Sequence, residues 1–150
     1  MILYNRHTQA ARILDRTQSS QAFIAPGQVN GNFAVWYRCK AERKCNVYRY
    51  NISLKVTKKV PNPKGKDQHS PSVTPTGIVY FARGSKRCGS AARLMRYISG
   101  SPPKALMRFK DGVDVGDSYA SANANGGTDV YFEQNKCRTT VGSDIFKIAN

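Results

Sequence analysis

Acidic residues are scarce in most of this 150-residue chain. Residues 1–110 contain 21 Lys and Arg but only three acids, Asp15, Glu42 and Asp67, which gives a net charge of +18. Residues 111–150 hold three bases and six acids, which gives −3, so the whole chain carries +15. A domain with so little negative charge repels itself unless a polyanion screens it. This imbalance favours a nucleic-acid partner, ahead of an anionic membrane surface or the role of a cationic toxin.

Long hydrophobic runs are also lacking. The longest uncharged apolar run, residues 33–37, is far too short to cross a membrane. The amino terminus reaches a charge at Arg6, too early for a signal peptide. The hydrophobic fraction of 40% is nevertheless too high for a fully disordered chain. The sequence therefore predicts neither a membrane protein nor a conventional secreted precursor, but one folded domain with a tail.

Cysteine and histidine are too sparse for a metal centre or a disulfide scaffold. The four cysteines are Cys39, Cys45, Cys88 and Cys137, and the two histidines are His7 and His69. No CxxC pair occurs among them, and a zinc site would need ligands from distant parts of the chain. We therefore expect no metal and no cofactor. The cysteines are expected to be ordinary thiols, or to form bridges late, between subunits.

Catalytic motifs are missing as well. The chain has no P-loop, dinucleotide fingerprint, nucleophile elbow or HExxH motif. His7 lies in a polar amino-terminal segment, and His69 lies in a Pro/Gly/Lys-rich stretch, residues 61–72, that we predict to be a long loop. We therefore expect no enzyme activity. A secreted cationic ribonuclease or toxin that uses one of these histidines stays open as an alternative.

A β-hairpin is the clearest pattern that is present. Two strands are predicted, residues 32–40 and 45–60, with residues 41–44 as a connection of hairpin length. Side chains alternate between the two faces of a strand, so residues of the same parity share a face. Along the second strand the apolar Tyr48, Tyr50 and Ile52 alternate with polar and basic residues. The pattern predicts one apolar face and one cationic face.

The cationic face is predicted to bind RNA. The residues assigned to it are Arg38 and Lys40 on the first strand and Arg49, Asn51, Ser53 and Lys55 on the second. A solvated outer sheet face, which is the alternative, normally mixes charges of both signs, but this set contains no acid. Short polar side chains suit bases and ribose, and the neighbouring Trp36 suits stacking.

The rest of the sequence predicts an α+β fold. A weak amino-terminal hairpin precedes the central strands, and another strand is expected at residues 76–82. Two short helices follow, at residues 91–98 behind the N-cap candidate Ser90 and at residues 104–110 behind a Pro-Pro pair. The Gly- and Asp-rich composition after residue 111 places a boundary near residue 112. We predict a shell domain at 1–112 and an acidic extension at 113–150, with possible short strands at 128–132 and 145–148.

This order of elements resembles the coat proteins of single-stranded RNA bacteriophages of the levivirus type. The resemblance is carried by residues 31–55, above all the run 48–54, and by residues 78–85 running into 91–95, and it covers about residues 1–110. It implies a homodimer whose sheets join edge to edge and whose two helices clasp the partner. It also implies that one sheet face binds genomic RNA, including a hairpin that represses translation, and that the loop 61–72 packs around symmetry axes.

The resemblance assigns the six residues of the cationic face to RNA contact. The leading expectation is thus a coat protein that dimerises, assembles into an icosahedral shell and packages single-stranded RNA. It would be found in the virion after synthesis in the bacterial cytoplasm. A cellular RNA-binding protein, ribosomal or regulatory, and the cationic ribonuclease or toxin are the alternatives.

Overall fold

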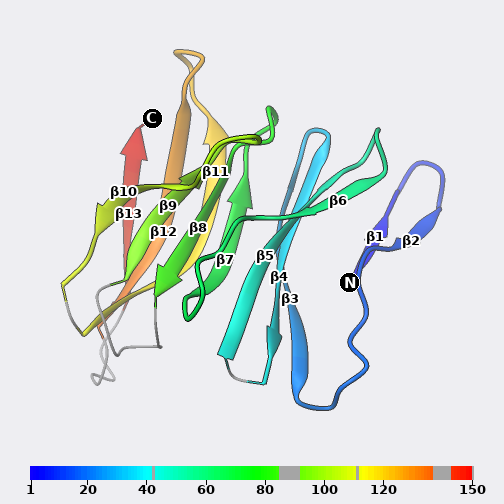
Figure 1. Ribbon diagram of the computed structural model, residues 1–150. Coiled ribbons are helices and arrows are strands. Elements are labelled where there is room, and N and C mark those ends of the chain that lie inside the picture. The colour runs from blue at the N-terminus through cyan, green and yellow to red at the C-terminus, as the bar shows by residue number, and fades with distance from the viewer. Residues whose placement is uncertain (42, 85–91, 111, 137–142, 150) are drawn as a thin grey trace.

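The chain forms an all-β structure in the computed structural model, which describes residues 1–41, 43–84, 92–110, 112–136 and 143–149 (Figure 1). Thirteen strands within these ranges form four antiparallel sheets. They are β1 (Ile2–Tyr4), β2 (Ala11–Ile13), β3 (Ala22–Asn30), β4 (Phe33–Lys40), β5 (Arg43–Asn51), β6 (Val56–Lys59), β7 (Asp67–Val73), β8 (Val79–Gly84), β9 (Arg93–Tyr97), β10 (Lys104–Arg108), β11 (Val113–Ala122), β12 (Thr128–Lys136) and β13 (Ser143–Ala149). The predicted α+β class is therefore wrong.

The predicted central hairpin is confirmed as β4 and β5, in a sheet with strand order β3-β4-β5-β6. Trp36 lies opposite Tyr48 in its register. Ala41 and Lys44, at the two ends of the connection, both have positive φ (54° and 61°), a conformation that lets the chain reverse within a few residues.

A disulfide bond joins the two strands of this hairpin. Cys39 and Cys45 face each other next to the turn and are covalently paired. Both are buried, against the inner side of the sheet. The expectation of ordinary thiols, or of bridges between subunits, is thus wrong for this pair. Cys88 and Cys137 lie outside the described residues.

The predicted second strand, residues 45–60, is two strands with a turn between them. β5 ends at Asn51, whose side-chain oxygen accepts a hydrogen bond from the backbone N–H of Leu54 at 2.9 Å. Lys55 has a φ of 55°, and β6 then runs back along β5. Asn favours turns because its side chain replaces a backbone partner in this way.

Both predicted helices are strands, β9 and β10, in the sheet β10-β9-β8-β7. β9 is paired along both of its edges, by β8 and β10. Leu94 and Met95, expected on one helical face, point to opposite sides and enter two different core clusters. A strand buried on both faces has consecutive apolar residues, so periodicity alone does not distinguish it from a helix. The helical clasp on a dimer partner has no counterpart within residues 92–110.

Part of the predicted loop, residues 61–72, is strand β7, the edge strand of the β10-β9-β8-β7 sheet, which also contacts β3, β4 and β5 of the other four-stranded sheet. Its Gln68 is fully buried and takes part in no regular ladder with β5. Instead its side-chain oxygen accepts a hydrogen bond from the Val47 N–H at 3.1 Å, and its amide donates to the Pro61 carbonyl at 2.9 Å. The polar side chains of β7 replace backbone partners, which is why its sequence shows no apolar alternation.

Strands β11, β12 and β13 form a third sheet that shares a core with β8 and β9. Val115 and Phe132 of this sheet pack with Tyr80 and Leu94 in one buried cluster. The strands expected at 128–132 and 145–148 are confirmed, as parts of β12 and β13. Gln28, at a bulge in β3, connects the sheets: its side chain bonds the N–H and the carbonyl of Ala120 and the N–H of Val73. Residues on both sides of position 112 thus share one hydrophobic core.

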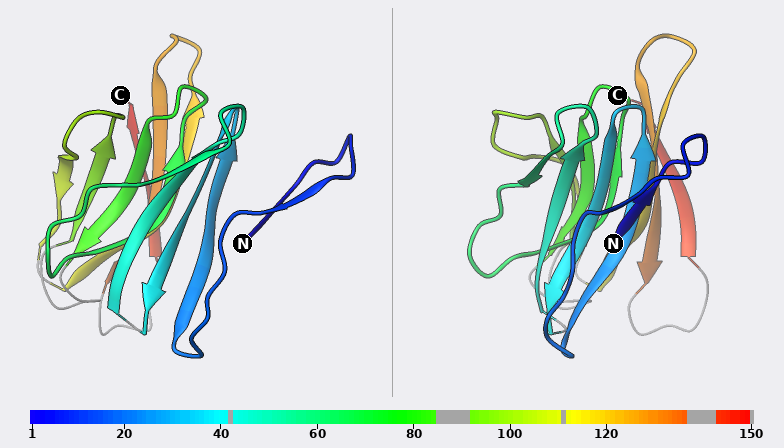
Figure 2. Two further views of the ribbon diagram at one scale, coloured as in Figure 1. Left: turned by 45° about the vertical axis from the view of Figure 1, so that its right-hand side comes forward. Right: turned by 90° about the vertical axis from the view of Figure 1, so that its right-hand side faces the viewer.

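The amino-terminal hairpin β1–β2 projects from the side of the β3–β6 sheet (Figure 2). We call residues 1–15 the arm. Met1, Leu3 and Leu14 pack against the outer face of the sheet, where they help to bury Ala34, Trp36 and Tyr50. Ile2, Tyr4 and Ile13 stay largely exposed on the arm. In the part of the chain that the structure describes, no helix has the length and apolarity needed to span a membrane.

Candidate nucleic-acid interface

The six residues predicted to bind RNA do not share one face of the sheet. Residues directly opposite each other in an antiparallel pair point to the same side. Arg38 lies on the side of Trp36, which is opposite Tyr48, whereas Arg49 is opposite Val35, on the other side. Arg38 and Lys40 are therefore separated from Arg49 and Asn51 by the sheet itself.

We call the side that faces the arm the aromatic face. Alternation along the strands and the cross-strand register assign it its members, Trp36, Arg38, Lys40, Tyr48, Tyr50, Thr57 and Lys59. The opposite side, the core face, carries Phe33, Val35, Tyr37, Val47, Arg49 and Lys58, and its apolar members pack against β7, β8 and β9. Each face thus combines aromatic rings with cations.

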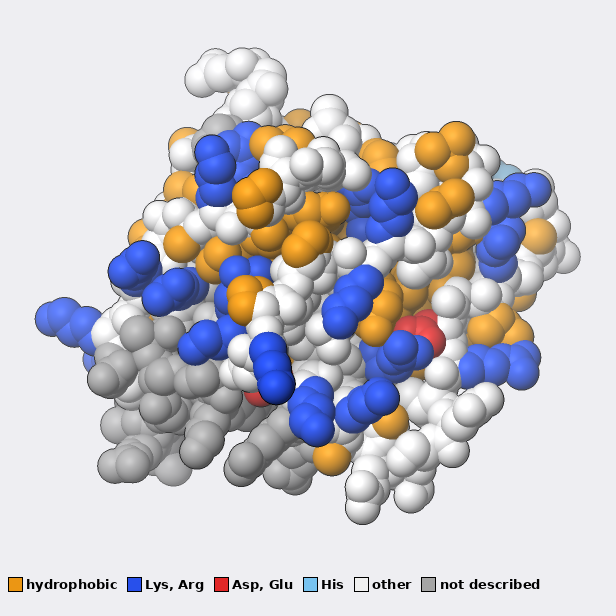
Figure 3. Space-filling view, viewed as in Figure 1, with side chains coloured by type: hydrophobic (Ala, Val, Ile, Leu, Met, Phe, Trp, Pro, Cys, Tyr) orange, Lys and Arg blue, Asp and Glu red, His pale blue; other side chains and the backbone are white. Residues whose placement is uncertain are grey.

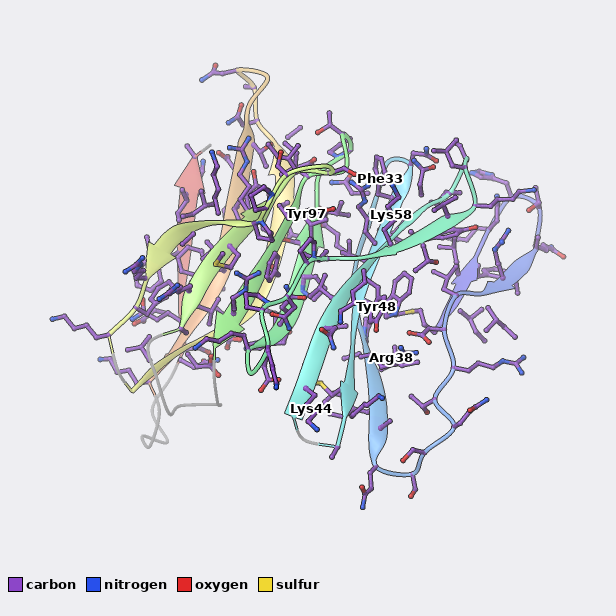
Figure 4. All side chains as sticks on the ribbon, in the orientation of Figure 1. Phe33, Arg38, Lys44, Tyr48, Lys58 and Tyr97 are labelled. Carbon is purple, nitrogen blue, oxygen red and sulfur yellow. A yellow bond between two sulfur atoms is a disulfide. The ribbon has the colours of Figure 1, made fainter. Side chains whose placement is uncertain are left out.

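Three side chains form a stack on the aromatic face. The rings of Trp36 and Tyr48 are nearly parallel, 15° apart, with centroids 5.8 Å from each other. The guanidinium carbon of Arg38 lies 5.0 Å from the Tyr48 centroid and adds a cation–π contact. In Figure 4 the side chains of Arg38 and Tyr48 lie next to each other beside β5. The stack runs from a buried indole to a guanidinium whose side chain is 34% exposed.

Asp15, at the end of the arm, holds this stack through its two carboxylate oxygens. One accepts a hydrogen bond from the Trp36 indole at 2.8 Å, and the other pairs with the Arg38 guanidinium at 2.9 Å. Partial burial works to lower the pKa of Arg38, but Tyr48 and Asp15 raise it above the ordinary arginine value. The guanidinium stays charged at any physiological pH.

The arm adds a further cation to the aromatic face. The guanidinium of Arg12 lies 5.4 Å from the centroid of the Tyr50 ring. Lys40, Thr57 and Lys59 on the sheet are exposed. Sequence reasoning missed Tyr48 as a site residue, because it took the parity of β5 that carries the tyrosines to be the apolar side. It assigned Lys59 to the cationic face together with Arg49, whereas the register places Lys59 opposite Tyr48.

Arg49, on the core face, donates its hydrogen bonds to neutral partners. Its guanidinium donates to the Gly77 carbonyl at 2.8 Å and to the Ser99 hydroxyl at 3.0 Å, and it lies 5.1 Å from the Phe33 centroid. Position 77 requires glycine, because its φ is 84° and a β-carbon there would come within 2.6 Å of the Phe33 ring. Arg49 therefore connects the β3–β6 sheet to the β7–β8 turn and to the end of β9.

The other three predicted residues lie at the end of β5 and in the turn that follows it. Asn51 accepts hydrogen bonds from the Asn32 amide and the Leu54 N–H. Ser53 donates through both its N–H and its hydroxyl to the Asn32 side chain, at 2.9 and 2.8 Å. Lys55 is exposed at the tip. Asn51 and Ser53 thus have structural partners, although Ser53 is exposed, and Lys55 is exposed beside them.

Positive charge extends well beyond the central hairpin. The space-filling view shows many Lys and Arg side chains and few acidic ones on the face that carries β6 and β10 (Figure 3). Most of the lysines and arginines in residues 1–110 are described as exposed, which fits the charge imbalance of that region. The aromatic face therefore lies within a broadly cationic surface.

The two histidines lie on separate elements. His7 is exposed in the turn of the arm. His69 is half-buried in β7, where its ring contacts the Ser70 hydroxyl at 3.2 Å and lies 3.8 Å from the Asp114 carboxylate. No group of three or more His, Cys, Asp or Glu side chains is arranged to hold a metal ion among the residues with described positions.

Comparisons with known protein families, with curated proteins and with solved structures find no match for this chain.

Proposed function

We propose that this protein binds single-stranded RNA through the aromatic face. The observation that carries the proposal is the stack of Trp36, Tyr48 and Arg38 with exposed lysines around it. A flat guanidinium at the end of an aromatic stack is a platform on which an unpaired base stacks, and lysines at its rim suit the phosphates. Duplex RNA keeps its bases inside the helix and offers no such surface, so the arrangement favours a single strand.

The Asp15 carboxylate makes Arg38 a position at which one anion can be exchanged for another. It holds Arg38 in place and occupies the position that a phosphate oxygen of bound RNA would take, since both are anionic acceptors for a guanidinium. The Arg38 side chain is 34% exposed and that of Asp15 is 10% exposed, so a ligand can reach the guanidinium from the solvent side. RNA that neutralises Arg38 would replace one anion with another at the same donors.

We further propose that the protein is a coat subunit that assembles with copies of itself around RNA. The support is the large number of apolar side chains that the described chain leaves exposed. They are Ile2, Tyr4, Ile13, Phe23, Val29, Leu54, Val56, Ile98, Met107, Tyr119, Tyr131, Ile145 and Phe146. Several lie on edge strands, which are ready to pair with another chain. Contiguous exposed apolar patches commonly mark contact surfaces between proteins.

Particle formation tests the coat proposal. The full chain is expressed, separated by size exclusion and imaged by negative stain, and co-purifying RNA is challenged with nuclease. Uniform shells with nuclease-protected RNA are expected. Small soluble species under all conditions of salt, pH and added RNA would contradict the coat role. RNA binding by those species would then favour a cellular RNA-binding protein.

Salt dependence tests RNA binding itself. Affinity for a labelled oligouridylate is measured by fluorescence anisotropy at several salt concentrations. Four cations at the aromatic face, Arg12, Arg38, Lys40 and Lys59, predict a log–log slope of roughly −3. A slope near zero, or equal affinity for duplex and single strand, would contradict the proposal. Hydrolysis of the RNA that disappears in a His69→Ala variant would support the ribonuclease alternative.

A further inference from the structure

A cavity lies away from the aromatic face, between the β7–β10 sheet and the β11–β12 hairpin. Its volume is about 380 Å³. It is lined by the turn that joins β7 to β8, by β8 and β9, and by the end of the β11–β12 hairpin. The chemistry-bearing members of this lining are Arg96, Thr74, Thr76, Thr128 and Tyr80. We call it the Arg96 pocket.

Arg96 has a buried nitrogen with no partner. Its Nε is inaccessible to solvent and forms no hydrogen bond, and Arg96 takes part in no ion pair in the described ranges. A donor left unpaired in this way costs free energy that a bound acceptor recovers. A charged donor recovers most when that acceptor is an anion.

A like charge lies directly beside Arg96. Lys104 on β10 is its cross-strand partner, so the two cations point to the same side of the sheet. Like charges at opposite positions of adjacent strands repel each other. An anion bound between Arg96 and Lys104 would reduce that repulsion.

The pocket lining contains no carboxylate that could play this role. The acid closest in sequence is Asp129, next to the lining residue Thr128. Alternation along β12 turns Asp129 to the opposite side of its sheet, where it pairs with Lys147 at 2.7 Å. That pairing lowers the pKa of Asp129, chiefly through the hydrogen bond from Lys147. The cation in the pocket is therefore not neutralised from within this lining.

From this geometry we propose that the Arg96 pocket binds a phosphate monoester of a nucleoside. The phosphate would lie on Arg96, and the hydroxyls of Thr76 and Thr128 would reach the phosphate or the ribose. Pro75 and Ile78 supply an apolar wall for the base. The volume lies within the range of about 300–1,000 Å³ usual for small-molecule sites, which is enough for one nucleotide. The same chemistry is present in a free nucleoside monophosphate and in the phosphorylated end of an RNA strand.

This inference does not depend on RNA binding at the aromatic face. The two sites use different strands and different cations, and each is expected to survive the loss of the other. A Lys59→Glu variant, altered only on the aromatic face, should keep its affinity for a nucleoside monophosphate. Failure of one proposal is thus distinguishable from failure of the other.

Titration of the full chain tests the pocket. Uridine monophosphate, uridine and inorganic phosphate are added separately, and binding is followed by calorimetry and by backbone amide chemical shifts. We expect saturable binding of the monophosphate, with shifts confined to the β7–β8 turn, β9 and the β11–β12 hairpin. Uridine should bind at least about tenfold more weakly, because it lacks the charge that pairs with Arg96. No saturation by the monophosphate at millimolar concentration would overturn the proposal, as would equal affinity for uridine.

Two matched variants separate the pocket from general charge. Arg96→Gln removes the cation in the pocket, and Arg93→Gln removes an exposed cation from the opposite side of the same strand. Arg96→Gln should lose about tenfold or more in affinity, and Arg93→Gln less than about twofold. Circular dichroism checks that both variants are folded. If Arg96→Gln does not fold, Arg96→Lys, which keeps the charge, is used as a second variant. Equal losses in the Arg96 and Arg93 variants would overturn the proposal.

Oligonucleotides with and without a terminal phosphate distinguish the two ligand sources. If the pocket binds the end of an RNA strand, a 5′- or 3′-phosphorylated oligouridylate should bind more tightly than its hydroxyl-ended form, and Arg96→Gln should abolish the difference. If the free monophosphate binds but the terminal phosphate of the oligonucleotide makes no difference, the ligand is a mononucleotide. Both outcomes support a phosphate monoester site. Binding of neither the monophosphate nor the phosphorylated end would overturn it.

Discussion

The two faces of the central sheet each carry an arginine over an aromatic ring, at nearly the same distance: Arg38 at 5.0 Å from Tyr48 and Arg49 at 5.1 Å from Phe33. Their hydrogen-bond partners differ. Arg49 donates to the carbonyl of the buried Gly77 and to the hydroxyl of the exposed Ser99. Arg38 donates to the carboxylate of the arm and to a tyrosine hydroxyl.

This difference teaches that partner chemistry, more than residue type, separates a structural cation from an interaction site. Neutral partners fixed in the fold make Arg49 a connection between sheets, and a ligand could take these donors only by breaking the hydrogen bonds to Gly77 and Ser99. An anionic partner at a partly exposed site makes Arg38 exchangeable, because another anion satisfies the same donors. The two faces can be tested against each other by matched substitutions.

The largest expected effect is a loss of stability on changing Trp36, which the arm covers on the aromatic face. Trp36→Ala removes a fully buried indole together with its stacking on Tyr48 and its hydrogen bond to Asp15. We expect it to lower the free energy of unfolding by about 3–5 kcal/mol. Urea denaturation followed by circular dichroism measures the loss, since Trp36 is the only tryptophan. Leu54→Ala, at a 71% exposed side chain, is the control and should change stability by less than about 0.5 kcal/mol.

Next in size is the effect of removing the connection on the core face. Arg49→Met breaks hydrogen bonds to Gly77 and Ser99 and should destabilise the fold by about 2 kcal/mol. Its RNA affinity should fall by less than about twofold, as for any distant charge. Arg38→Met should instead lose about tenfold in RNA affinity when measured under conditions where the protein is folded. The reverse ranking of the two variants in RNA affinity would refute the assignment of the binding site to the aromatic face.

Two adjacent lysines of β6 give the sharpest comparison of RNA binding. Lys59 is opposite Tyr48 on the aromatic face, and Lys58 is opposite Arg49 on the core face, and both are exposed. Lys59→Glu should weaken oligouridylate binding about three- to tenfold more than Lys58→Glu, although the two variants have the same net charge. Anisotropy titrations at one salt concentration measure this ratio. A ratio near one would mean that the whole surface binds RNA by charge alone.

The smallest expected effect concerns the anion on the arm. Asp15→Asn removes the carboxylate that competes with phosphate for Arg38, so RNA affinity should rise about two- to threefold. Asp117→Asn, an exposed acid on β11, makes the same change in net charge and is the control. Trp36 fluorescence shows whether the arm has stayed in place, since a red-shifted emission would report exposure of the indole. Equal increases in the two variants would show that Asp15 has no special position.

The strands of the central hairpin were predictable because alternation is a local property. Trp36 and Arg38 share a face in any extended conformation of β4, and Tyr48 and Tyr50 share one in β5. How the two patterns combine depends on the register, and the register depends on the turn. The pairing shifts between Lys40, which is opposite Arg43, and Arg38, which is opposite Asn46, and this shift places Trp36 opposite Tyr48, so the tyrosines of β5 join the arginine of β4 on one side. The expected combination of Arg38 with Arg49 was wrong for this reason.

Strands β7 and β9 could not be recognised by the same pattern. β9 buries both faces, so Leu94 and Met95 follow each other where a half-buried strand would alternate. β7 buries Gln68 and Ser72, which are satisfied by hydrogen bonds to segments far away in the sequence. A rule based on apolar periodicity has no access to such partners.

The sequence alone determined the sign and distribution of charge, the scarcity of catalytic groups and the positions of the central strands. Each of these depends on residue type or on spacing along a few neighbouring positions. The tertiary structure decided which cations remain available, because the partners that occupy them are distant: Asp15 lies 23 positions from Arg38, and Gly77 lies 28 positions from Arg49. It also created the Arg96 pocket from turns and strands that meet only in the folded chain.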